Sequence, residues 1–288
     1  MKKKTRRWIA AIAAAAVLSL LGWALVWGNT ALVTANVLVC SNGIPEAFDA
    51  YKIVQISDLH DAQIGENNEK LIAMTAETEP DCIVLTGDFV DSSRFHPERS
   101  LSVAESLVKL APVYYVSGNH EAIIPDADYQ ALTDGLRALG VCVLEDESAE
   151  LTRDGQSIRL IGLTDIGFHP GTLEEKKDTL RSALSALLPE DEFSVTLAHR
   201  PELMDVYTEC GAPLVLSGHA HGGQIRLPGI GGLIAPGQGL FPKYTEGKYE
   251  ENGTTLVVSR GIGNSVLPLR VNDRPQIVVV QLACNDRM

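Results

Sequence analysis

Short apolar runs alternate with helix-like patterns along most of this chain. The first three runs, at 51–56, 82–86 and 113–116, have the length and the β-branched and aromatic content of buried strands. Between them, apolar residues recur at spacings of three and four over 66–78 and 101–108, as they do on one face of a helix. Alternating strands and helices predict an α/β fold built on a largely parallel sheet.

The second half of the chain repeats this alternation. Another helix is expected around Leu180, Ala183, Leu184 and Leu187, which share one helical face. Further strands are expected at 157–163, 193–198, 212–216, 254–259 and 276–282. The span 222–242 is rich in Gly and Pro and has no periodicity, so we expect loops there.

Metal-ligating residue types follow five of these strands. The carboxyl ends of parallel strands meet at one edge of a sheet, so side chains placed there converge. Five of the seven histidines lie at such positions with two aspartates and one asparagine: Asp58, His60, Asp88, Asn119, His120, His199, His219 and His221. Two adjacent divalent cations need several oxygen and nitrogen ligands each and one carboxylate shared between them. The sequence therefore predicts a dinuclear metal site, with Asp61 as an alternative to Asp58.

An uncharged run of twenty residues, 8–27, precedes these patterns. A helix of that length crosses the roughly 30 Å hydrocarbon core of a bilayer. Five basic residues stand before the run, which favours a cytoplasmic N-terminus and a domain outside the cell: Lys2, Lys3, Lys4, Arg6 and Arg7. The alternative is an exported chain whose N-terminal segment is a cleaved signal peptide.

These segments divide the chain into three parts. Residues 1–29 are expected to form a cytoplasmic basic tip and a transmembrane anchor. Residues 30–50 are expected to connect the anchor to the main domain, with an edge strand at 31–40. The main domain then comprises residues 51–288.

Composition and charge exclude several classes of function. The chain has 288 residues, 45% of them hydrophobic, which is enough for a large packed core. Its formal net charge is −13, and removing the five N-terminal positive charges leaves −18, an unfavourable balance for binding nucleic acid. The chain has neither a Gly-Lys-Ser/Thr phosphate-binding loop nor a Gly-x-Ser-x-Gly elbow. Five scattered cysteines argue against a disulfide framework, and we expect Cys82 and Cys142 to be buried thiols.

The ordered motifs Asp-x-His, Gly-Asp, Gly-Asn-His-Glu, His and Gly-His-x-His resemble the calcineurin-like metallophosphoesterase family over roughly residues 50–282. The resemblance implies a β-sandwich of mixed sheets flanked by helices, and two divalent metal ions, with manganese, iron and zinc as candidates. It implies that one metal is held by Asp58, His60 and His221, and the other by Asn119, His199 and His219. It also implies that Asp88 bridges the metals and that His120 stands beside the reacting phosphate.

The anchor, the opening at 56–60 and the closing stretch at 259–263 resemble the membrane-anchored bacterial branch of that family. This branch includes pyrophosphatases of UDP-2,3-diacylglucosamine. The resemblance implies a metal-dependent phosphoric ester hydrolase that acts at the membrane surface through metal-activated hydroxide. The bond cleaved is expected to be a phosphomonoester, phosphodiester or diphosphate bond in a phosphorylated small molecule or a phospholipid-like substrate.

Two arginines on late loops, Arg260 and Arg270, are candidate anion anchors, because a guanidinium matches the spacing of phosphate oxygens. A structural role is the alternative for each of them. Two other functions are alternatives for the whole chain: a metal-binding or sensing member without turnover, and a metallo-nuclease. The acidic body and the anchor disfavour the nuclease, so no nucleic acid partner is expected.

Overall fold

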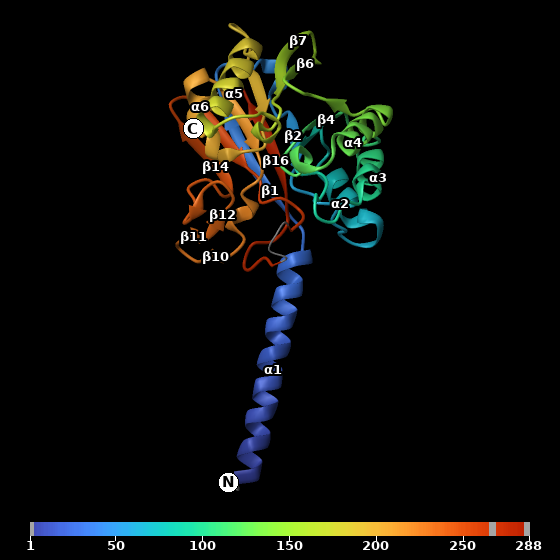
Figure 1. The fold of residues 1–288 in the computed structure, drawn as a ribbon, viewed down its shortest axis with the longest axis vertical. Coiled ribbons are helices and arrows are strands. Elements are labelled where there is room, and N and C mark those ends of the chain that lie inside the picture. Colours follow the sequence, from blue (N-terminus) through green and yellow to red (C-terminus); the bar gives the residue numbers. More distant parts are fainter. Residues whose placement is uncertain (1–2, 265–268, 285–288) are drawn as a thin grey trace.

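One long helix leads into two packed β-sheets that carry helices on both outer faces (Figure 1). The computed structural model describes residues 3–264 and 269–284, so Lys2 of the predicted basic flank lies outside it. The helices are α1 (Lys3–Thr30), α2 (Glu69–Glu77), α3 (Pro97–Leu107), α4 (Asp126–Ala138), α5 (Leu173–Leu187) and α6 (Met204–Cys210).

The first sheet has six strands in the order β1-β16-β2-β3-β4-β5. Every neighbouring pair in it is parallel except β16 with β2. Its strands are β1 (Val33–Cys40), β2 (Lys52–Ile56), β3 (Cys82–Thr86), β4 (Val113–Val116), β5 (Cys142–Val143) and β16 (Gln276–Ala283).

The second sheet also has six strands, in the order β14-β15-β9-β8-β7-β6. Only its two edge pairs, β14 with β15 and β6 with β7, are antiparallel. Its strands are β6 (Glu147–Arg153), β7 (Gln156–Gly162), β8 (Ser194–Leu197), β9 (Leu214–Ser217), β14 (Gly247–Glu251) and β15 (Thr254–Val258). The expected sandwich of mixed sheets is confirmed. The strands divide between two sheets, which the alternation of strands and helices alone does not reveal.

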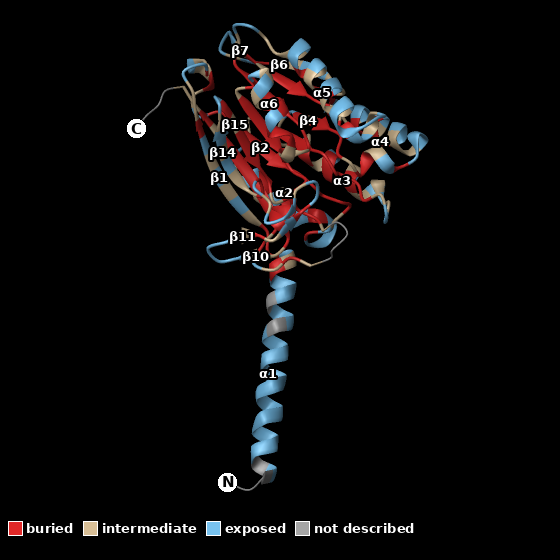
Figure 2. Ribbon diagram, turned by 60° about the vertical axis from the view of Figure 1, so that its left-hand side comes forward, coloured by how far each residue is buried: buried red, intermediate tan, exposed pale blue. Residues whose placement is uncertain are grey.

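Three buried apolar layers hold the sheets and helices together (Figure 2). Along β3, Ile83 packs in the layer under α2, α3 and α4, while the next residue, Val84, packs between the two sheets. Along β7, Leu160 faces the layer between the sheets and Ile161 faces the layer under α5 and α6. Because both faces of these strands are covered, their sequences are apolar runs rather than alternating patterns.

The predicted strands and helices are all present among the described residues. The structure adds α4, α6 and three strands at or near sheet edges, β5, β6 and β14. β6 buries only one of its seven residues, Leu151, so its sequence carries little apolar signal. The span expected to consist of loops contains two short hairpins, formed by β10 (Arg226–Leu227) with β11 (Gly231–Gly232) and β12 (Ile234–Ala235) with β13 (Gly239–Leu240).

The two cysteines that we expected to be buried differ in exposure. Cys82 is buried and Cys142 is exposed. β5 is a two-residue strand at the edge of the first sheet, and successive residues of a strand point to opposite faces. Val143 therefore faces the core and Cys142 faces solvent, so the prediction for Cys142 is wrong.

α1 passes into the sandwich without a flexible linker. It ends at Thr30, Ala31 and Leu32 are buried, and β1 begins at Val33 as the expected edge strand. The Asn29 side-chain oxygen accepts hydrogen bonds from the backbone N–H of Arg270 and from the Asn264 amide, both at 3.0 Å. The segment Arg6–Thr30 is long and apolar enough to cross a membrane. The direction of this helix is thus fixed relative to the domain.

Candidate metal centre

Five loops bring the predicted ligands together where strands of both sheets end. Asp58 and His60 follow β2, and Asp88 follows β3. The remaining residues follow β4, β8 and β9: Asn119, His120, His199, His219 and His221. At this end Gln55 of β2 ties the sheets together, because its amide donates to Thr86 Oγ1 of β3 at 3.0 Å and to the Ser217 carbonyl of β9 at 2.9 Å.

The loops at this end hold unusual backbone conformations. Left-handed φ angles between 45° and 64° occur at five of the residues named as ligands: Asp58, His60, Asp88, His219 and His221. Each such conformation costs a non-glycine residue on the order of 1–2 kcal/mol, and it persists only where the surroundings fix it. Two glycines allow the loops to approach closely, since a Cβ at Gly118 would collide with Asp88, and one at Gly218 would collide with Ser57 and Asp58.

The ligand-type atoms form two adjacent groups that share one carboxylate. In each group the atoms lie within 4.8 Å of one another. The first group is Asp58, His60, Asp88 and His221, and the second is Asp88, His199 and His219. Asn119 joins the second group, because its Oδ1 lies 3.1 Å from His199 Nε2. This division has the same membership as the two ligand sets that the family resemblance implies.

Backbone hydrogen bonds orient the two carboxylates. Both oxygens of Asp58 accept from the His219 backbone N–H, at 3.0 and 3.1 Å. Asp88 Oδ1 accepts from the His120 backbone N–H at 2.8 Å. The other oxygen, Oδ2, lies 3.2 Å from His199 Nε2 and 3.7 Å from His60 Nε2. Asp88 Oδ2 therefore sits between imidazoles of the two groups.

The imidazole nitrogens fit a pair of bound cations. His60 Nε2 faces His221 Nε2 at 3.2 Å, and His219 Nδ1 faces His199 Nε2 at 3.1 Å. Two facing imidazole nitrogens can share at most one proton between them, whereas a cation placed between them would be bound by both. In addition, His60 Nδ1 and His219 Nε2 are buried without a hydrogen-bond partner among the described residues. His199 Nδ1 donates to the Thr86 carbonyl at 2.9 Å, so Nε2 is the nitrogen that would hold a metal once it loses its proton.

Three of the histidines are held in the neutral form that ligates metals. Burial is the main cause, and it lowers the pKa of His60 to about 3. Burial and the neighbouring His199 hold the pKa of His219 well below its usual range. Burial, His60 and Arg270 do the same for the pKa of His221. These three rings are ready to bind a cation without first losing a proton.

His199 carries the positive charge that balances the buried carboxylates. Burial opposes charge on its ring, but attraction to Asp88 and Asp58 outweighs burial and raises the pKa of His199 to about 10. For Asp88, burial is likewise outweighed by His199, so the pKa of Asp88 lies well below its usual range. Burial raises the pKa of Asp58 to about 6. A dication at the shared carboxylate would take over this balance from the His199 proton.

Glu121 organises the loops around Asp88, a role that sequence reasoning missed. Its fully buried carboxylate accepts the backbone N–H groups of Gly118 at 2.7 Å, Asp88 at 2.9 Å, Phe89 at 2.7 Å and Val90 at 3.1 Å. Burial and the Asp88 charge raise the pKa of Glu121 to about 7, against the opposing effect of these hydrogen bonds. The residue closes the Gly-Asn-His-Glu motif, but the motif does not show which N–H groups it meets.

Two further charged residues stand behind the histidines. The Arg270 Nη2 lies 3.3 Å from His221 Nδ1, and the same atom donates to the Gly263 carbonyl at 2.6 Å. With 1% of its surface exposed, Arg270 contacts His221 rather than open solvent. Glu202 Oε1 lies 3.5 Å from His219 Nε2. The Arg270 contact fixes the orientation of the His221 ring, and Glu202 places a carboxylate beside the His219 ring.

His120 lies beside the two groups and belongs to neither. The Ser92 backbone N–H donates to His120 Nδ1 at 3.1 Å, so a neutral ring carries its proton on Nε2. The His120 and His60 rings meet edge to face, with their centroids 4.4 Å apart. This places a proton donor next to the first group.

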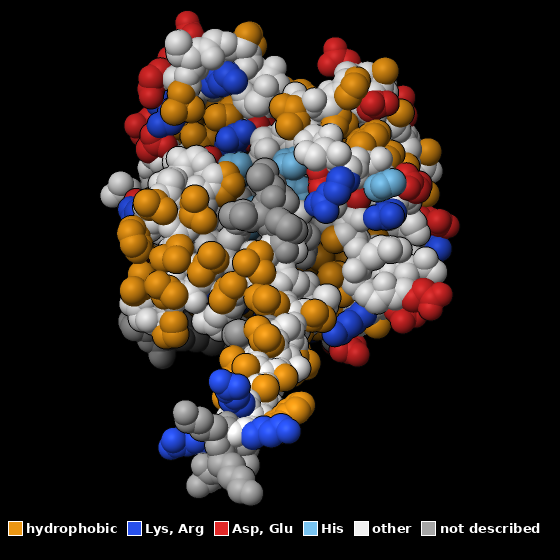
Figure 3. Space-filling model, turned by 60° about the horizontal axis from the view of Figure 1, so that its bottom comes forward, with side chains coloured by type: hydrophobic (Ala, Val, Ile, Leu, Met, Phe, Trp, Pro, Cys, Tyr) orange, Lys and Arg blue, Asp and Glu red, His pale blue; other side chains and the backbone are white. Residues whose placement is uncertain are grey.

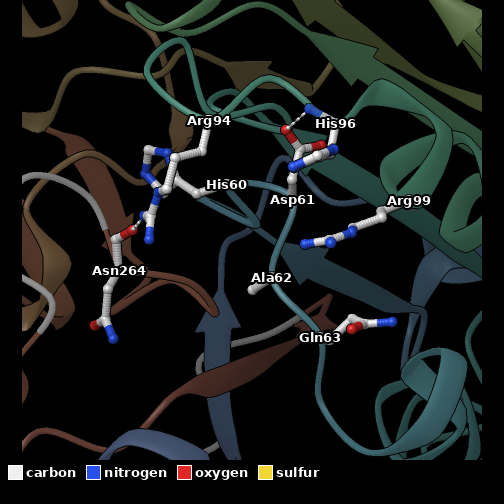
Figure 4. Close-up of a pocket in the computed structure, with 8 residues that line it drawn as sticks. All are labelled: His60, Asp61, Ala62, Gln63, Arg94, His96, Arg99 and Asn264. Atoms are coloured by element: carbon white, nitrogen blue, oxygen red, sulfur yellow. Dashed lines mark hydrogen bonds between the residues drawn. The ribbon is translucent and has the colours of Figure 1, made fainter.

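A cleft of about 290 Å³ opens at His60 (Figure 4). Figure 4 shows Arg94 and Asn264 on one side of it and Asp61, His96 and Arg99 on the other. Asp61 is not part of either group: its carboxylate accepts from Ser100 Oγ at 2.7 Å and from the His96 backbone N–H at 2.9 Å. It therefore fixes the loop before α3 and does not compete with Asp58. No motif surrounds the other residues that line the cleft, so the sequence did not indicate the role of Arg94, His96 and Arg99.

Arg260 lies away from this cleft. It pairs with Glu246 and stands 3.7 Å from Asp273, in a separate cavity beside α1 that Arg270 also lines. His169, outside the predicted motifs, is half-buried after β7 and is not among the residues that line the cleft.

The first prediction concerns Glu121. In Glu121→Gln an amide NH₂ replaces one carboxylate oxygen, so a donor faces backbone N–H groups that need acceptors. Buried donors left without partners cost about 1–3 kcal/mol each, so we expect a loss of about 3 kcal/mol in the free energy of unfolding, together with a lower metal content. Denaturant unfolding and elemental analysis measure both. The control, Glu105→Gln on the exposed face of α3, should change stability by less than about 0.5 kcal/mol. Equal stability of the two variants would show that the Glu121 hydrogen bonds do not organise the loops.

Comparisons with known proteins concern this same region. Residues 51–223 match the family of calcineurin-like phosphoesterases. The chain is 34% identical to the metallophosphoesterase YkuE of Bacillus subtilis over 260 residues, which covers 86% of this chain and 85% of YkuE. It is 28% identical to the phosphodiesterase YaeI of Escherichia coli over 81% of this chain and 82% of YaeI. A transmembrane protein with a metallophosphoesterase domain from Bos taurus is 28% identical over 93% of this chain and 60% of that protein.

The matched region runs from the start of β2 to the loop after β9 and contains every residue of the two groups. The family match and the geometry of the site therefore rest on the same residues. These buried aspartates and histidines offer carboxylate oxygens and imidazole nitrogens, which are the ligand types that manganese, iron and zinc bind. By its sequence and by this site, the chain belongs to the calcineurin-like phosphoesterase family and is a metal-dependent phosphoric ester hydrolase.

Proposed function

We propose that the two groups bind two divalent cations. One cation would be held by Asp58, His60 and His221, and the other by Asn119, His199 and His219, with the Asp88 carboxylate shared. The facing imidazole nitrogens and the position of Asp88 Oδ2 between the groups support this assignment. The ligand set combines nitrogen and oxygen atoms without a thiolate, which suits manganese, iron or zinc.

We propose that the reaction is hydrolysis of a phosphodiester. The observation that carries this is the buried carboxylate of Asp88, which the two groups share. Its Oδ2 lies 3.7 Å from Nε2 of His60, and His60 lines the cleft that bears Arg94 and Arg99. Two divalent cations, when bound, polarise a phosphoryl group and lower the pKa of water at the site. Arg99 offers a guanidinium group to the remaining phosphate oxygens, and so does Arg94 through the part of its guanidinium that is not bonded to Asp91. The similarity to the phosphodiesterase YaeI supports a diester over a monoester or a diphosphate.

We propose that His120 donates a proton from Nε2 to the leaving oxygen or stabilises the charge that develops there. Its backbone is held by Asp88 and its Nδ1 by Ser92, so the ring has one orientation. Arg270 and Glu202 act as positioning residues, the former behind His221 and the latter behind His219.

We propose that α1 anchors the chain in a membrane, with Arg6 and Arg7 at the cytoplasmic end and the domain outside. The most apolar 18-residue stretch of the candidate span Arg6–Thr30 is not buried against the domain. The similarity to a transmembrane protein from Bos taurus supports a membrane location. Retention of the helix is favoured over cleavage because Asn29 is bonded into the domain through Asn264 and Arg270.

The proposed activity is tested on the purified full chain in detergent, with its metal content measured. We expect metal-dependent hydrolysis of bis(p-nitrophenyl) phosphate, slower hydrolysis of p-nitrophenyl phosphate and none of DNA, since the chain carries a net charge of −13. Two bound metals without turnover of any ester would instead indicate a sensing role. Cleavage of DNA would indicate a nuclease.

The second prediction concerns the shared carboxylate. Asp88→Asn removes one negative charge from between the two cation sites, so at least one metal and most of the activity should be lost. Asp178→Asn, on the exposed face of α5, is the matched control and should keep both metals. Elemental analysis and ester hydrolysis measure the outcome. Two metals per chain and normal turnover in Asp88→Asn would refute the shared position.

The third prediction concerns His120. His120→Asn should keep both metals and lower the turnover of an alkyl ester by roughly a hundredfold, the size of effect typical of a lost acid. The loss should be much smaller for p-nitrophenyl esters, whose oxygen leaves without protonation. His169→Asn serves as control and should leave both rates unchanged. Equal losses for both ester types would leave charge stabilisation as the role of His120, and loss of metal would make it a positioning residue.

The fourth prediction concerns orientation in the membrane. Leu173 lies at the exposed start of α5, with 56% of its surface accessible. In a chain with Cys142→Ser, a cysteine introduced by Leu173→Cys should react with a membrane-impermeant maleimide on intact cells. A cysteine introduced by Lys4→Cys should react only after the cells are permeabilised. The reverse pattern would place the domain in the cytoplasm.

A further inference from the structure

A cluster of exposed hydrophobic side chains covers the two hairpins that β10–β13 form. We call it the hairpin surface, and its members are Leu227, Ile230, Ile234, Leu240 and Phe241. The two most exposed members, Leu240 and Phe241, have 71% and 66% of their surface accessible. Among the described residues outside α1, the other exposed large hydrophobic side chains lie singly in three separate elements: Leu38, Ile123 and Leu173. Single exposed hydrophobic residues are ordinary, whereas a cluster marks an interaction surface.

The hairpin surface lies beside the end of α1 that enters the domain. Figure 1 places β10 and β11 at the same end of the domain as α1, and Figure 3 shows hydrophobic side chains gathered on the face from which the helix emerges. A cavity of about 730 Å³ separates them, with Leu25 and Trp27 of α1 on one wall and Arg226 of β10 on another. The last turns of the helix and the hairpins thus border the same space.

This cavity is rich in positive charge. Four arginines line it, Arg226, Arg260, Arg270 and Arg274. The acidic residues paired with them are Glu246, which meets Arg226 and Arg260, and Asp273, which meets Arg260 and Arg270. Four guanidinium groups against two carboxylates leave a local excess of positive charge on an otherwise acidic domain.

Arg274, which contacts α1, stacks on a tryptophan, and this combination is typical of a membrane interface. The guanidinium of Arg274 lies 4.4 Å from the centre of the Trp27 ring and donates to the Ala31 carbonyl at 2.8 Å. Tryptophan is enriched at the level of lipid headgroups, and arginine there pairs with lipid phosphates. The junction of α1 with the domain therefore has the composition of an interface between hydrocarbon and water.

We propose that the hairpin surface and the adjoining arginines form a second membrane-binding surface, which rests on the leaflet that α1 enters and binds its anionic phospholipids. Leu240 and Phe241 enter the apolar region, while Arg226 and Arg274 meet lipid phosphates. The proposal rests on the proposed membrane insertion of α1. Because Asn29 fixes α1 to the domain, a helix that crosses the bilayer brings the hairpins to the same leaflet.

A bilayer fits this surface better than a second copy of the chain does. In a symmetric dimer through the hairpin surface, the same patch would face itself, so Arg226, Arg260 and Arg274 of one copy would approach the same residues of the other. An anionic leaflet instead offers an apolar layer to the hydrophobic side chains of the hairpins and negatively charged headgroups to the arginines.

The proposed surface also explains where the cleft opens. Asn264 lines the cleft at His60, and its amide donates to Asn29 at the end of α1. Cleft and hairpin surface therefore border the same end of α1. A phosphate ester carried on a bilayer lipid would meet the cleft without leaving the membrane.

The test uses the full chain in lipid nanodiscs. We place the photoreactive residue benzoylphenylalanine at position 241 (Phe241→benzoylphenylalanine), with Leu173→benzoylphenylalanine as the control at a site of similar exposure on α5. In discs containing phosphatidylglycerol, we expect at least ten times more lipid adduct from position 241 than from position 173. The yield of lipid adducts at position 241 should fall when phosphatidylcholine replaces the anionic lipid. Lipid adducts no more abundant at 241 than at 173, a yield independent of lipid charge, or adducts between two chains would each overturn the proposal.

A second variant tests the contribution of Leu240 and Phe241 to lipid binding, with a measurement that does not depend on ester hydrolysis. With benzoylphenylalanine at Ile230, the double substitution Leu240→Asp and Phe241→Asp should reduce lipid adducts at least fivefold, because charged side chains do not enter hydrocarbon. Hydrolysis of a soluble ester in detergent should be unchanged, which shows that the variant is folded. An unchanged adduct yield would overturn the proposal. Failure of the proposed reaction is recognised separately, since adduct formation needs no turnover.

Discussion

One buried residue, Asp88, connects the loops that carry the two ligand groups. Its side chain accepts from the His120 backbone, its own N–H is bound by Glu121, and its carbonyl accepts from the His60 backbone at 3.0 Å. Loops after three strands are thus fixed by one residue. A buried carboxylate is tolerated only with such partners, and the imidazoles on either side provide the rest of its stabilisation. The left-handed conformations at the site persist because contacts such as these fix the loops.

Much of the fold and most of the site could be predicted from the sequence, because their signals are local. β3 reads as an apolar run that ends at Thr86, and Asp88 follows two residues later. A strand covered on both faces needs apolar residues at successive positions, and a metal site needs a small set of residue types. Each feature therefore gives a short, continuous pattern in the sequence. The order of these motifs along the chain then indicates the family.

The contributions that sequence reasoning missed depend on distant contacts. Glu121 meets the N–H groups of the loop after β3, more than thirty residues earlier, and only the parallel pairing of β3 with β4 brings them together. Arg270 stands on a late loop, as an anion anchor would, but folding places it behind His221. Cys142 has apolar neighbours, yet a two-residue edge strand turns it to solvent. In each case the partner is set by tertiary structure, which residue type and spacing do not encode.

The direct passage from α1 into β1 leaves no tether. An enzyme on a flexible linker searches a volume whose radius grows with linker length. Here the helix and the sandwich turn together, so a chain inserted in a membrane as proposed would hold its cleft at a fixed distance from the lipid and would move only within a thin layer beside the membrane. Such a chain would meet long polymers only where they reach that layer, and its rate of encounter with substrate would depend on crowding within the plane of the membrane rather than on concentration in the surrounding solution.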